Sequence, residues 1–288
     1  MTRDTPGSLR VRDAFATAAA EGRIGFVPYV VAGYPEAGTS ESVALAAIDA
    51  GADVLELGLP YSDPLADGAT VQRASAAALA AGATLSRSLA LVERVCRARP
   101  ATPVLVMGYV NQFLGPTGAD KVARRLADAG AVGAIVPDLT PDEGAALEDA
   151  FLGHGLALIY LVAPTTPTDR AAAIAARGGG FLYLVSLAGV TGARSSLPAS
   201  LKALVTRVKS VSPLPVAVGF GVSRPAHVRA VARTGADGVV VGSALVDALG
   251  PAGEDIAGLT QLCRQLRAAT TLRPAVVEGR HVGLPAPC

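Results

Sequence analysis

The segment Asp49-Ala-Gly-Ala-Asp-Val-Leu-Glu-Leu-Gly58 decides the fold, because its pattern occurs three times in the chain. The related segments are Asp128-Ala-Gly-Ala-Val-Gly-Ala-Ile-Val-Pro137 and Arg233-Thr-Gly-Ala-Asp-Gly-Val-Val-Val-Gly242. In each segment a helical run ends, a glycine follows where the chain needs φ > 0, and an apolar strand begins within a few residues. Short apolar strands that follow helices are typical of a parallel sheet with helical crossovers.

The rest of the chain also alternates strand-like and helical runs. We expect strands at Phe26–Val31, Val54–Leu59, Pro103–Met107, Gly133–Val136, Ala157–Val162, Phe181–Ser186, Pro215–Val218 and Gly238–Val241. We expect helices at Ser40–Ala50, Gly118–Ala129, Pro141–Leu152, Thr168–Arg177, Leu197–Val211 and Pro225–Arg233. Eight strands with helical crossovers predict an α/β fold, a (β/α)8 TIM barrel, although a doubly wound sheet fits the same periodicity.

Several segments add to this plan. An extra N-terminal helix, Leu9–Glu21, is expected to cover the bottom of the barrel. The segment Val71–Ala98 is long enough for two helices, with a break near residues 82–84. Thr140-Pro-Asp-Glu143 has the pattern of a capping box at a helix start. No linker divides the chain, so we expect one barrel domain over residues 1–272 and a disordered tail over residues 273–288.

Composition excludes several classes of protein. The net charge is +1 with both signs scattered, so no nucleic-acid partner is expected. The three cysteines are far apart, the N-terminus has no apolar signal segment, and the longest uncharged runs are interrupted by proline and glycine. We therefore expect a cytoplasmic protein with no membrane partner. The three histidines are isolated and no lysine lies in a strand, so neither a metal site nor a Schiff-base lysine is predicted.

Glu56 is the outstanding candidate for catalysis. In the repeated pattern it occupies the strand position of Ile135 and Val240, where burial should raise the pKa of its carboxyl group. A second carboxylate, Asp67, follows in a turn-rich loop. Two carboxylates in different environments can separate an acid from a base. A structural role for Glu56 and a simple turn at Asp67 are the alternatives.

Glycine-containing loops follow the last three expected strands. They are Ala188-Gly-Val-Thr-Gly-Ala-Arg194, Gly219-Phe-Gly-Val-Ser223 and Gly242-Ser243. Each could be an ordinary tight turn. Three together at the carboxyl ends of consecutive barrel strands predict a phosphate site, because bare backbone N–H groups there can contact an anion.

The stretch Leu55–Gly68, LELGLPYSDPLADG, resembles the signature of the tryptophan synthase α subunit family. The glycine loops match that family's phosphate loops, and the resemblance extends from about Phe15 to about Leu272. It implies a barrel lyase that cleaves indole-3-glycerol phosphate to indole and glyceraldehyde 3-phosphate, the α reaction in the last step of tryptophan biosynthesis. It also implies an αββα heterotetramer in which the β subunit holds pyridoxal phosphate and this chain holds no cofactor.

The resemblance assigns roles to individual positions. Glu56 and Asp67 match the catalytic residues. Substrate-binding positions are matched by Tyr183, Thr191, Gly192, Gly221, Gly242 and Ser243, and by Tyr29, Met107, Tyr109 and Phe220, which would line the indole pocket. Positions near the partner contact are matched by Pro60, Asp63 and Asn111, and Asp138 matches a residue that orders mobile loops. The chain departs from the family at Ala69, at Leu187-Ala188 and at Thr140.

Three other functions use overlapping features. A free-standing indole-3-glycerol-phosphate lyase would need the same catalytic residues and would be fast without a partner. A non-catalytic α-like regulator of a β subunit would not need an intact Glu56 and Asp67. A phosphate-sugar isomerase or epimerase could use the same phosphate loops, but it leaves the Asp67 loop without a role.

Overall fold

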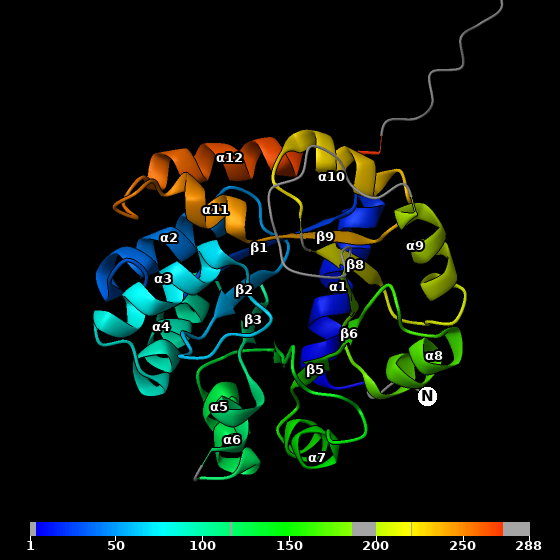
Figure 1. The fold of residues 1–288 in the computed structure, drawn as a ribbon, viewed down its shortest axis with the longest axis horizontal. Helices are drawn as coiled ribbons and strands as arrows, with labels where there is room; N and C mark the ends of the chain where they lie inside the picture. The colour runs from blue at the N-terminus through cyan, green and yellow to red at the C-terminus, as the bar shows by residue number, and fades with distance from the viewer. Residues whose placement is uncertain (1–3, 116, 186–199, 220, 273–288) are drawn as a thin grey trace, which may run out of the picture.

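The three repeated segments join helices to parallel strands as predicted (Figure 1). The computed structural model describes residues 4–115, 117–185, 200–219 and 221–272. Gly51, Gly130 and Gly235 follow helices with φ of 107°, 85° and 86°. This left-handed backbone is strained for residues with a Cβ, which explains why glycine recurs at this point of each repeat.

The strands form one parallel sheet that returns to its starting point. Within the described residues they are β1 Gly25–Val31, β2 Leu55–Gly58, β3 Val104–Met107, β4 Gly133–Ile135, β5 Ala157–Ile159, β6 Leu161–Val162, β7 Leu182–Val185, β8 Val216–Gly219 and β9 Gly238–Val241. Their order is β5-β4-β3-β2-β1-β9-β8-β7-β6. The first and last strands of this order are adjacent in the chain, so the sheet closes as a barrel and the predicted fold is confirmed.

The fifth expected strand is divided at Tyr160, which the sequence did not predict. Residues before it pair with β4, where Ile135 is opposite Ile159, and residues after it pair with β7, where Leu161 is opposite Tyr183. The Tyr160 side chain is buried, and its hydroxyl donates to Glu148 Oε1 at 2.6 Å. The strand therefore changes its neighbour at this residue, which gives nine short strands among the described residues in place of eight.

Helices surround the barrel. They are α1 Pro6–Ala20, α2 Ala37–Asp49, α3 Ala69–Ala80, α4 Leu85–Ala98, α5 Val110–Leu114, α6 Ala119–Asp128, α7 Ala145–Gly153, α8 Thr168–Arg177, α9 Leu201–Lys209, α10 Pro225–Ala232, α11 Ser243–Ala248 and α12 Ile256–Ala268. The predicted break between α3 and α4 is confirmed. The helices α5, α11 and α12 lie outside the ranges expected from the sequence.

Helix α1 covers the amino-terminal end of the barrel, as expected. Its Phe15 ring lies against Gly25 and Gly238, the first residues of β1 and β9; a Cβ on Gly238 would be 2.3 Å from the ring. The same ring packs on Phe181, with centroids 5.3 Å apart. The glycines at these strand starts therefore leave space for the Phe15 ring, which fills the amino-terminal end of the barrel.

The capping box predicted at Thr140 is wrong. Helix α7 begins at Ala145, after a turn in which the Glu143 N–H donates to the Thr140 carbonyl at 3.1 Å. The Thr140 hydroxyl donates to the Glu143 carboxylate at 3.1 Å instead of accepting a helix N–H. The polar pair thus closes its own turn, as short polar side chains do in competition with helices.

Two of the repeats contain a carboxylate that fastens one strand to the next. The Asp53 N–H donates to the Phe26 carbonyl at 2.9 Å, and the Phe26 N–H donates to Asp53 Oδ2 at 2.8 Å. Asp237 and Val216 exchange the same pair of bonds, each 2.8 Å long. Arg23, which is 5% exposed, donates to both Asp53 oxygens at 2.6 and 2.7 Å. This ion pair is partly buried and lies at the end of the barrel opposite the catalytic candidates.

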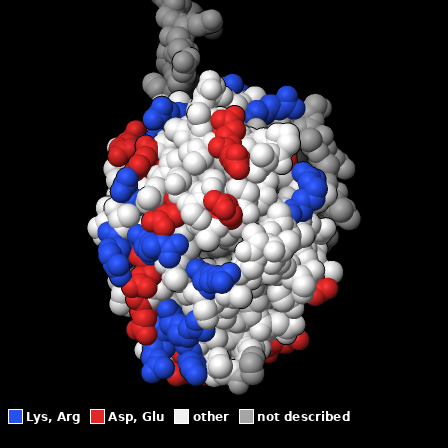
Figure 2. All heavy atoms as spheres, turned by 90° about the vertical axis from the view of Figure 1, so that its left-hand side faces the viewer, with Lys and Arg blue, Asp and Glu red and all other residues white. Residues whose placement is uncertain are grey.

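The surface over α2, α3 and α4 has mixed charge. Figure 2 shows cationic and anionic side chains beside one another on this face. Arg94 pairs with Glu41 and Arg99 pairs with Asp49, which joins α4 to α2. In the described part of the chain, no single helix is long and apolar enough to cross a membrane; α3 and α4 meet that test only together, and they are bent by 104°.

Candidate active site

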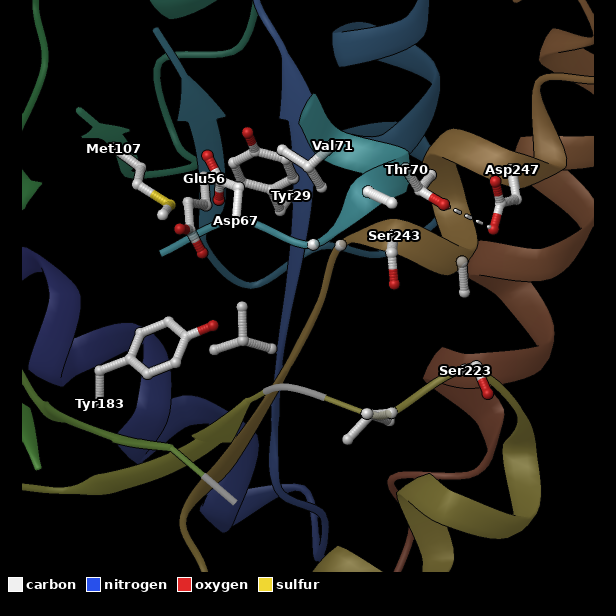
Figure 3. Close-up of a pocket in the computed structure, with 17 residues that line it drawn as sticks. Tyr29, Glu56, Asp67, Thr70, Val71, Met107, Tyr183, Ser223, Ser243 and Asp247 are labelled. Carbon is white, nitrogen blue, oxygen red and sulfur yellow. Dashed lines mark hydrogen bonds between the residues drawn. The ribbon is translucent and has the colours of Figure 1, made fainter. Parts of the chain in front are cut away.

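A cavity of about 320 Å³ opens at the carboxyl ends of the barrel strands (Figure 3). Eight of the predicted site residues line it: Tyr29, Glu56, Asp67, Met107, Tyr183, Gly221, Gly242 and Ser243. They come from strands β1, β2, β3 and β7 and from the loops after β2, β8 and β9. The closed barrel therefore brings together residues that are far apart in the sequence.

Glu56 is the most deeply buried of the cavity acids. The residue is 1% exposed, and its Oε2 has no hydrogen-bond partner among the described residues. Burial, followed by the nearby negative charge of Asp67, raises the pKa of Glu56 from 4.5 to about 8. Glu56 is therefore mainly protonated at neutral pH, as its strand position predicted, and it has a proton to give.

Asp67 is more exposed to solvent than Glu56, and its carboxylate accepts a hydrogen bond. Burial raises the pKa of Asp67 from 3.8 to about 6, and a hydrogen bond from Tyr109 opposes that rise. The Tyr109 hydroxyl donates to Asp67 Oδ2 at 3.0 Å. Asp67 is thus mainly ionised at pH 7 while Glu56 is mainly neutral. The two carboxyl groups have the separated protonation states that acid and charge-stabilising roles need.

Two tyrosines flank the acids, and each lies over a glycine. Tyr29 is opposite Glu56 in the β1–β2 register, and its hydroxyl would be 2.2 Å from a Cβ on Gly58. The hydroxyl of Tyr183 would be 2.3 Å from a Cβ on Gly219. Burial raises the pKa of both tyrosines well above 10, so both hydroxyls keep their protons. The two glycines therefore fix where these hydroxyls lie beside the acids.

The far end of the cavity consists of glycine and hydroxyl residues. Ser243 begins α11 directly after Gly242, and Figure 3 shows its hydroxyl directed away from the α11 ribbon. On the rim, the Thr70 hydroxyl donates to Asp247 Oδ2 at 3.4 Å. The charged residues that line the described cavity are Glu56, Asp67 and Asp247, all of them acidic.

Other predicted site residues lie elsewhere. Tyr109 does not line the cavity and instead contacts Asp67 from behind. Thr191, Gly192 and Phe220 lie outside the described residues. Four predicted residues lie outside the cavity lining, in the loop after β2, in α5 and after β4. Pro60 is buried and its carbonyl accepts from Gln112, whereas three others are exposed: Asp63, which accepts from Ser62; Asn111, which donates to Tyr61; and Asp138, which accepts from the Val110 N–H.

Nine further lining residues had no individual role predicted from the sequence: Gly68, Ala69, Thr70, Val71, Val222, Ser223, Val240, Ala244 and Asp247. Val222 and Ser223 nevertheless belong to a loop that was predicted to bind phosphate, and Gly68 ends the Leu55–Gly68 stretch. Thr70 and Val71 could have been found, because the first turn of the helix after Asp67 must begin at the same end of the barrel. Asp247 could not, because α11 itself was not predicted. Among the described residues, no group of three or more His, Cys, Asp or Glu side chains is placed to hold a metal ion.

The fold and the cavity define a class: a (β/α)8-barrel enzyme with a neutral and an ionised carboxyl group at the carboxyl ends of its strands. Residues 15–272 match the profile of the family described as tryptophan synthase alpha chain. The chain belongs to this family, and it is a lyase of the tryptophan synthase type.

Relatives and solved structures agree over nearly the whole chain. The tryptophan synthase alpha chain of Roseiflexus sp. (strain RS-1) is 46% identical, covering 90% of this chain and 99% of its own length. That of Gloeobacter violaceus is 44% identical, covering 94% and 97%. A chain in a structure of Mycobacterium tuberculosis tryptophan synthase superposes with a TM-score of 0.84 at 41% identity, covering 91% of this chain and 98% of that one.

Proposed function

We propose that the chain cleaves indole-3-glycerol phosphate to indole and glyceraldehyde 3-phosphate, with Glu56 as the acid and Asp67 as the charge-stabilising carboxylate. The observation that supports this most strongly is the pair of protonation states in one cavity: Glu56 has a pKa of about 8 and Asp67 of about 6. Membership of the tryptophan synthase alpha chain family supports the choice of substrate.

The reaction needs a proton at C3 of the indole ring before the carbon–carbon bond can break. Glu56 donates that proton, and burial favours the neutral form that can do so. Protonation places positive charge on the ring nitrogen, whose N–H donates to the Asp67 carboxylate. The Glu56 carboxylate then accepts the proton of the glycerol hydroxyl next to the breaking bond, while the bond's electron pair returns to the ring and the aldehyde forms.

The other cavity residues bind and orient the substrate in this proposal. The phosphate lies at the Gly221, Gly242 and Ser243 end, where backbone N–H groups and one hydroxyl can contact it. Tyr29 and Met107 contact the ring. Binding the phosphate far from the reacting bond holds the ring between the two acids.

A β subunit with pyridoxal phosphate is the proposed partner, and this chain holds no cofactor in the proposal. The outer side of the Asp67 loop and α5 is the proposed contact surface. Its exposure supports this: Asp63 and Asn111 are exposed, and the side chain of Leu65, two residues after Asp63, is 91% exposed. One domain over residues 1–272 fits the span of the family match. A cytoplasmic location stays a prediction.

An indole-formation assay from indole-3-glycerol phosphate tests the proposal, with and without a β subunit. We expect weak activity alone, strong stimulation by the partner, and a bell-shaped kcat/KM profile with limbs near pH 6 and pH 8. The two limbs belong to the coupled pair of acids. Rapid turnover without a partner would favour the free-standing lyase, and no indole under either condition would refute the proposal.

A further inference from the structure

Tyr109 holds both the Asp67 carboxylate and the backbone beside it. Its hydroxyl donates to Asp67 Oδ2 at 3.0 Å and accepts from the Ala66 N–H at 3.1 Å. Tyr109 is 3% exposed and is separated from the end of β3 by a single residue, Gly108. Two bonds to adjacent residues therefore fix a loop carboxylate against the end of a neighbouring barrel strand.

Tyr109 is itself held from several sides. The Tyr61 ring stacks on it, with centroids 5.1 Å apart and an interplanar angle of 22°. The Tyr61 hydroxyl accepts from Asn111 Nδ2 at 3.1 Å. The Tyr109 N–H donates to Gln112 Oε1 at 3.0 Å, and Gln112 Nε2 donates to the Pro60 carbonyl at 3.0 Å. The first turn of α5 and the loop after β2 thus enclose the phenol ring.

The remaining bonds of the Asp67 loop are local. The Asp67 N–H donates to the Pro64 carbonyl at 3.0 Å, and Gln72 Nε2 donates to the Asp67 carbonyl at 2.9 Å. These two bonds hold the backbone of Asp67, but neither of them restricts the rotation of its side chain. Among the described residues, Tyr109 is the group that hydrogen-bonds the Asp67 carboxylate.

We propose that Tyr109, supported by Tyr61, is a positioning residue that aims the Asp67 carboxylate at the substrate and favours its ionised form. The inference rests on the reaction proposed above, in which Asp67 accepts the ring N–H. A hydrogen bond to a carboxylate is stronger than one to a neutral acid, so the same contact sets direction and charge. Tyr109 acts through Asp67 and need not touch the substrate.

The charge effect has a definite sign. The groups that face Asp67 are Glu56 on β2, Tyr29 on β1, Tyr183 on β7 and Tyr109 itself. Burial raises the pKa of Asp67 and the Tyr109 hydrogen bond lowers it. Removal of the hydroxyl leaves burial unopposed, so the pKa of Asp67 rises above about 6 and the enzyme loses its ionised aspartate at a higher pH.

The test is the pH profile of Y109F, which keeps the ring and its stacking but lacks the hydroxyl. We expect the acid limb of kcat/KM to move up by about one pH unit while the alkaline limb stays in place. At pH 6 this corresponds to a severalfold loss of kcat/KM beyond any pH-independent loss. The variant Y61L, which removes the supporting ring, should move the acid limb in the same direction by less.

Y160F is the matched control, because it removes another buried tyrosine hydroxyl that donates to a carboxylate, Glu148, outside the cavity. It should lower stability and leave both limbs in place. An unmoved acid limb in folded Y109F, or an equal shift in Y160F, would overturn the inference. A carbon NMR titration of the Asp67 carboxyl group measures the pKa of Asp67 directly and needs no enzyme turnover. If the unaltered chain forms no indole, only the proposed function fails, and the titration still decides the role of Tyr109.

Discussion

Replacement of Glu56 by glutamine should make the protein inactive and more stable. Glutamine has nearly the shape of the protonated acid but cannot ionise or give a proton. At pH 7 the carboxyl group of Glu56 is ionised in the unfolded chain and mainly protonated in the folded chain, where it is 1% exposed and Oε2 lacks a hydrogen bond among the described residues. The free energy of unfolding of the natural chain must therefore include the cost of protonating this group on folding. The variant avoids that cost.

The size of the effect follows from the pKa of Glu56, which rises from 4.5 to about 8 on burial. The folded chain binds more protons than the unfolded chain between these values, so stability falls as the pH rises through this interval. At about 1.36 kcal/mol per pH unit, the full interval amounts to about 5 kcal/mol. We therefore expect Glu56→Gln to gain, relative to the natural chain, less than about 1 kcal/mol at pH 5, about 3 at pH 7 and about 5 at pH 9.

Urea unfolding followed by circular dichroism at these three pH values measures the difference. Asp67→Asn is the comparison variant, because the pKa of Asp67 rises only to about 6 and its own contribution changes little between pH 7 and pH 9. Any change of its relative stability in this interval comes from the lost Asp67 charge beside Glu56, and it should be smaller than the change for Glu56→Gln. A difference for Glu56→Gln that stays flat from pH 5 to pH 9, in a variant with a native spectrum, would refute the desolvated-acid assignment. Normal indole formation by the variant would refute its role as the acid.

Two further substitutions test how the barrel supports the site. Gly58→Ala would place a Cβ 2.2 Å from the Tyr29 hydroxyl, so we expect a loss of about 1–3 kcal/mol of stability and a lower kcat/KM. Gly153→Ala, with no atom within 4 Å of the new Cβ, should change neither property for the worse. Asp53→Ala would leave Arg23, 5% exposed, with only the exposed carboxylate of Glu21 as an ion-pair partner, and should cost about 3 kcal/mol in urea unfolding without a pH-dependent change in turnover. Asp53→Asn keeps an acceptor for the Phe26 N–H and should lose less.

Periodicity was sufficient for the order of strands and helices because each repeat contains its own local signals, but it left open whether the sheet closes. The glycines at residues 51, 130 and 235 end helices, and apolar runs follow them, so the element order could be predicted without any knowledge of distant contacts. Glu56 could be predicted for the same reason, as a polar residue at an apolar position of a repeat. The misplaced start of α7 shows the limit of local patterns, because Thr140 and Glu143 satisfy each other within a turn.

The contacts that tune the site could not be predicted from local patterns. Tyr109 and Asp67 are 42 residues apart, and Thr70 and Asp247 are 177 apart. The first pair meets because β2 and β3 are neighbours in the sheet, and the second because the first strand β1 pairs with the last strand β9. Asp67 on its own resembles an ordinary turn residue. Its ionised state follows from a tyrosine that no pattern around residue 67 indicates.

The cavity also couples proton binding to anion binding. Its ionisable acidic lining residues in the described part of the chain are Glu56, Asp67 and Asp247, and each of them repels a phosphate group when it is ionised. Protonated Glu56 removes one of the three charges. A phosphate therefore binds more readily when Glu56 is protonated, and by linkage a bound phosphate favours the protonated form by the same free energy. In the proposed reaction this linkage favours catalysis, because the phosphate of the bound substrate helps to keep Glu56 protonated and therefore able to protonate the ring.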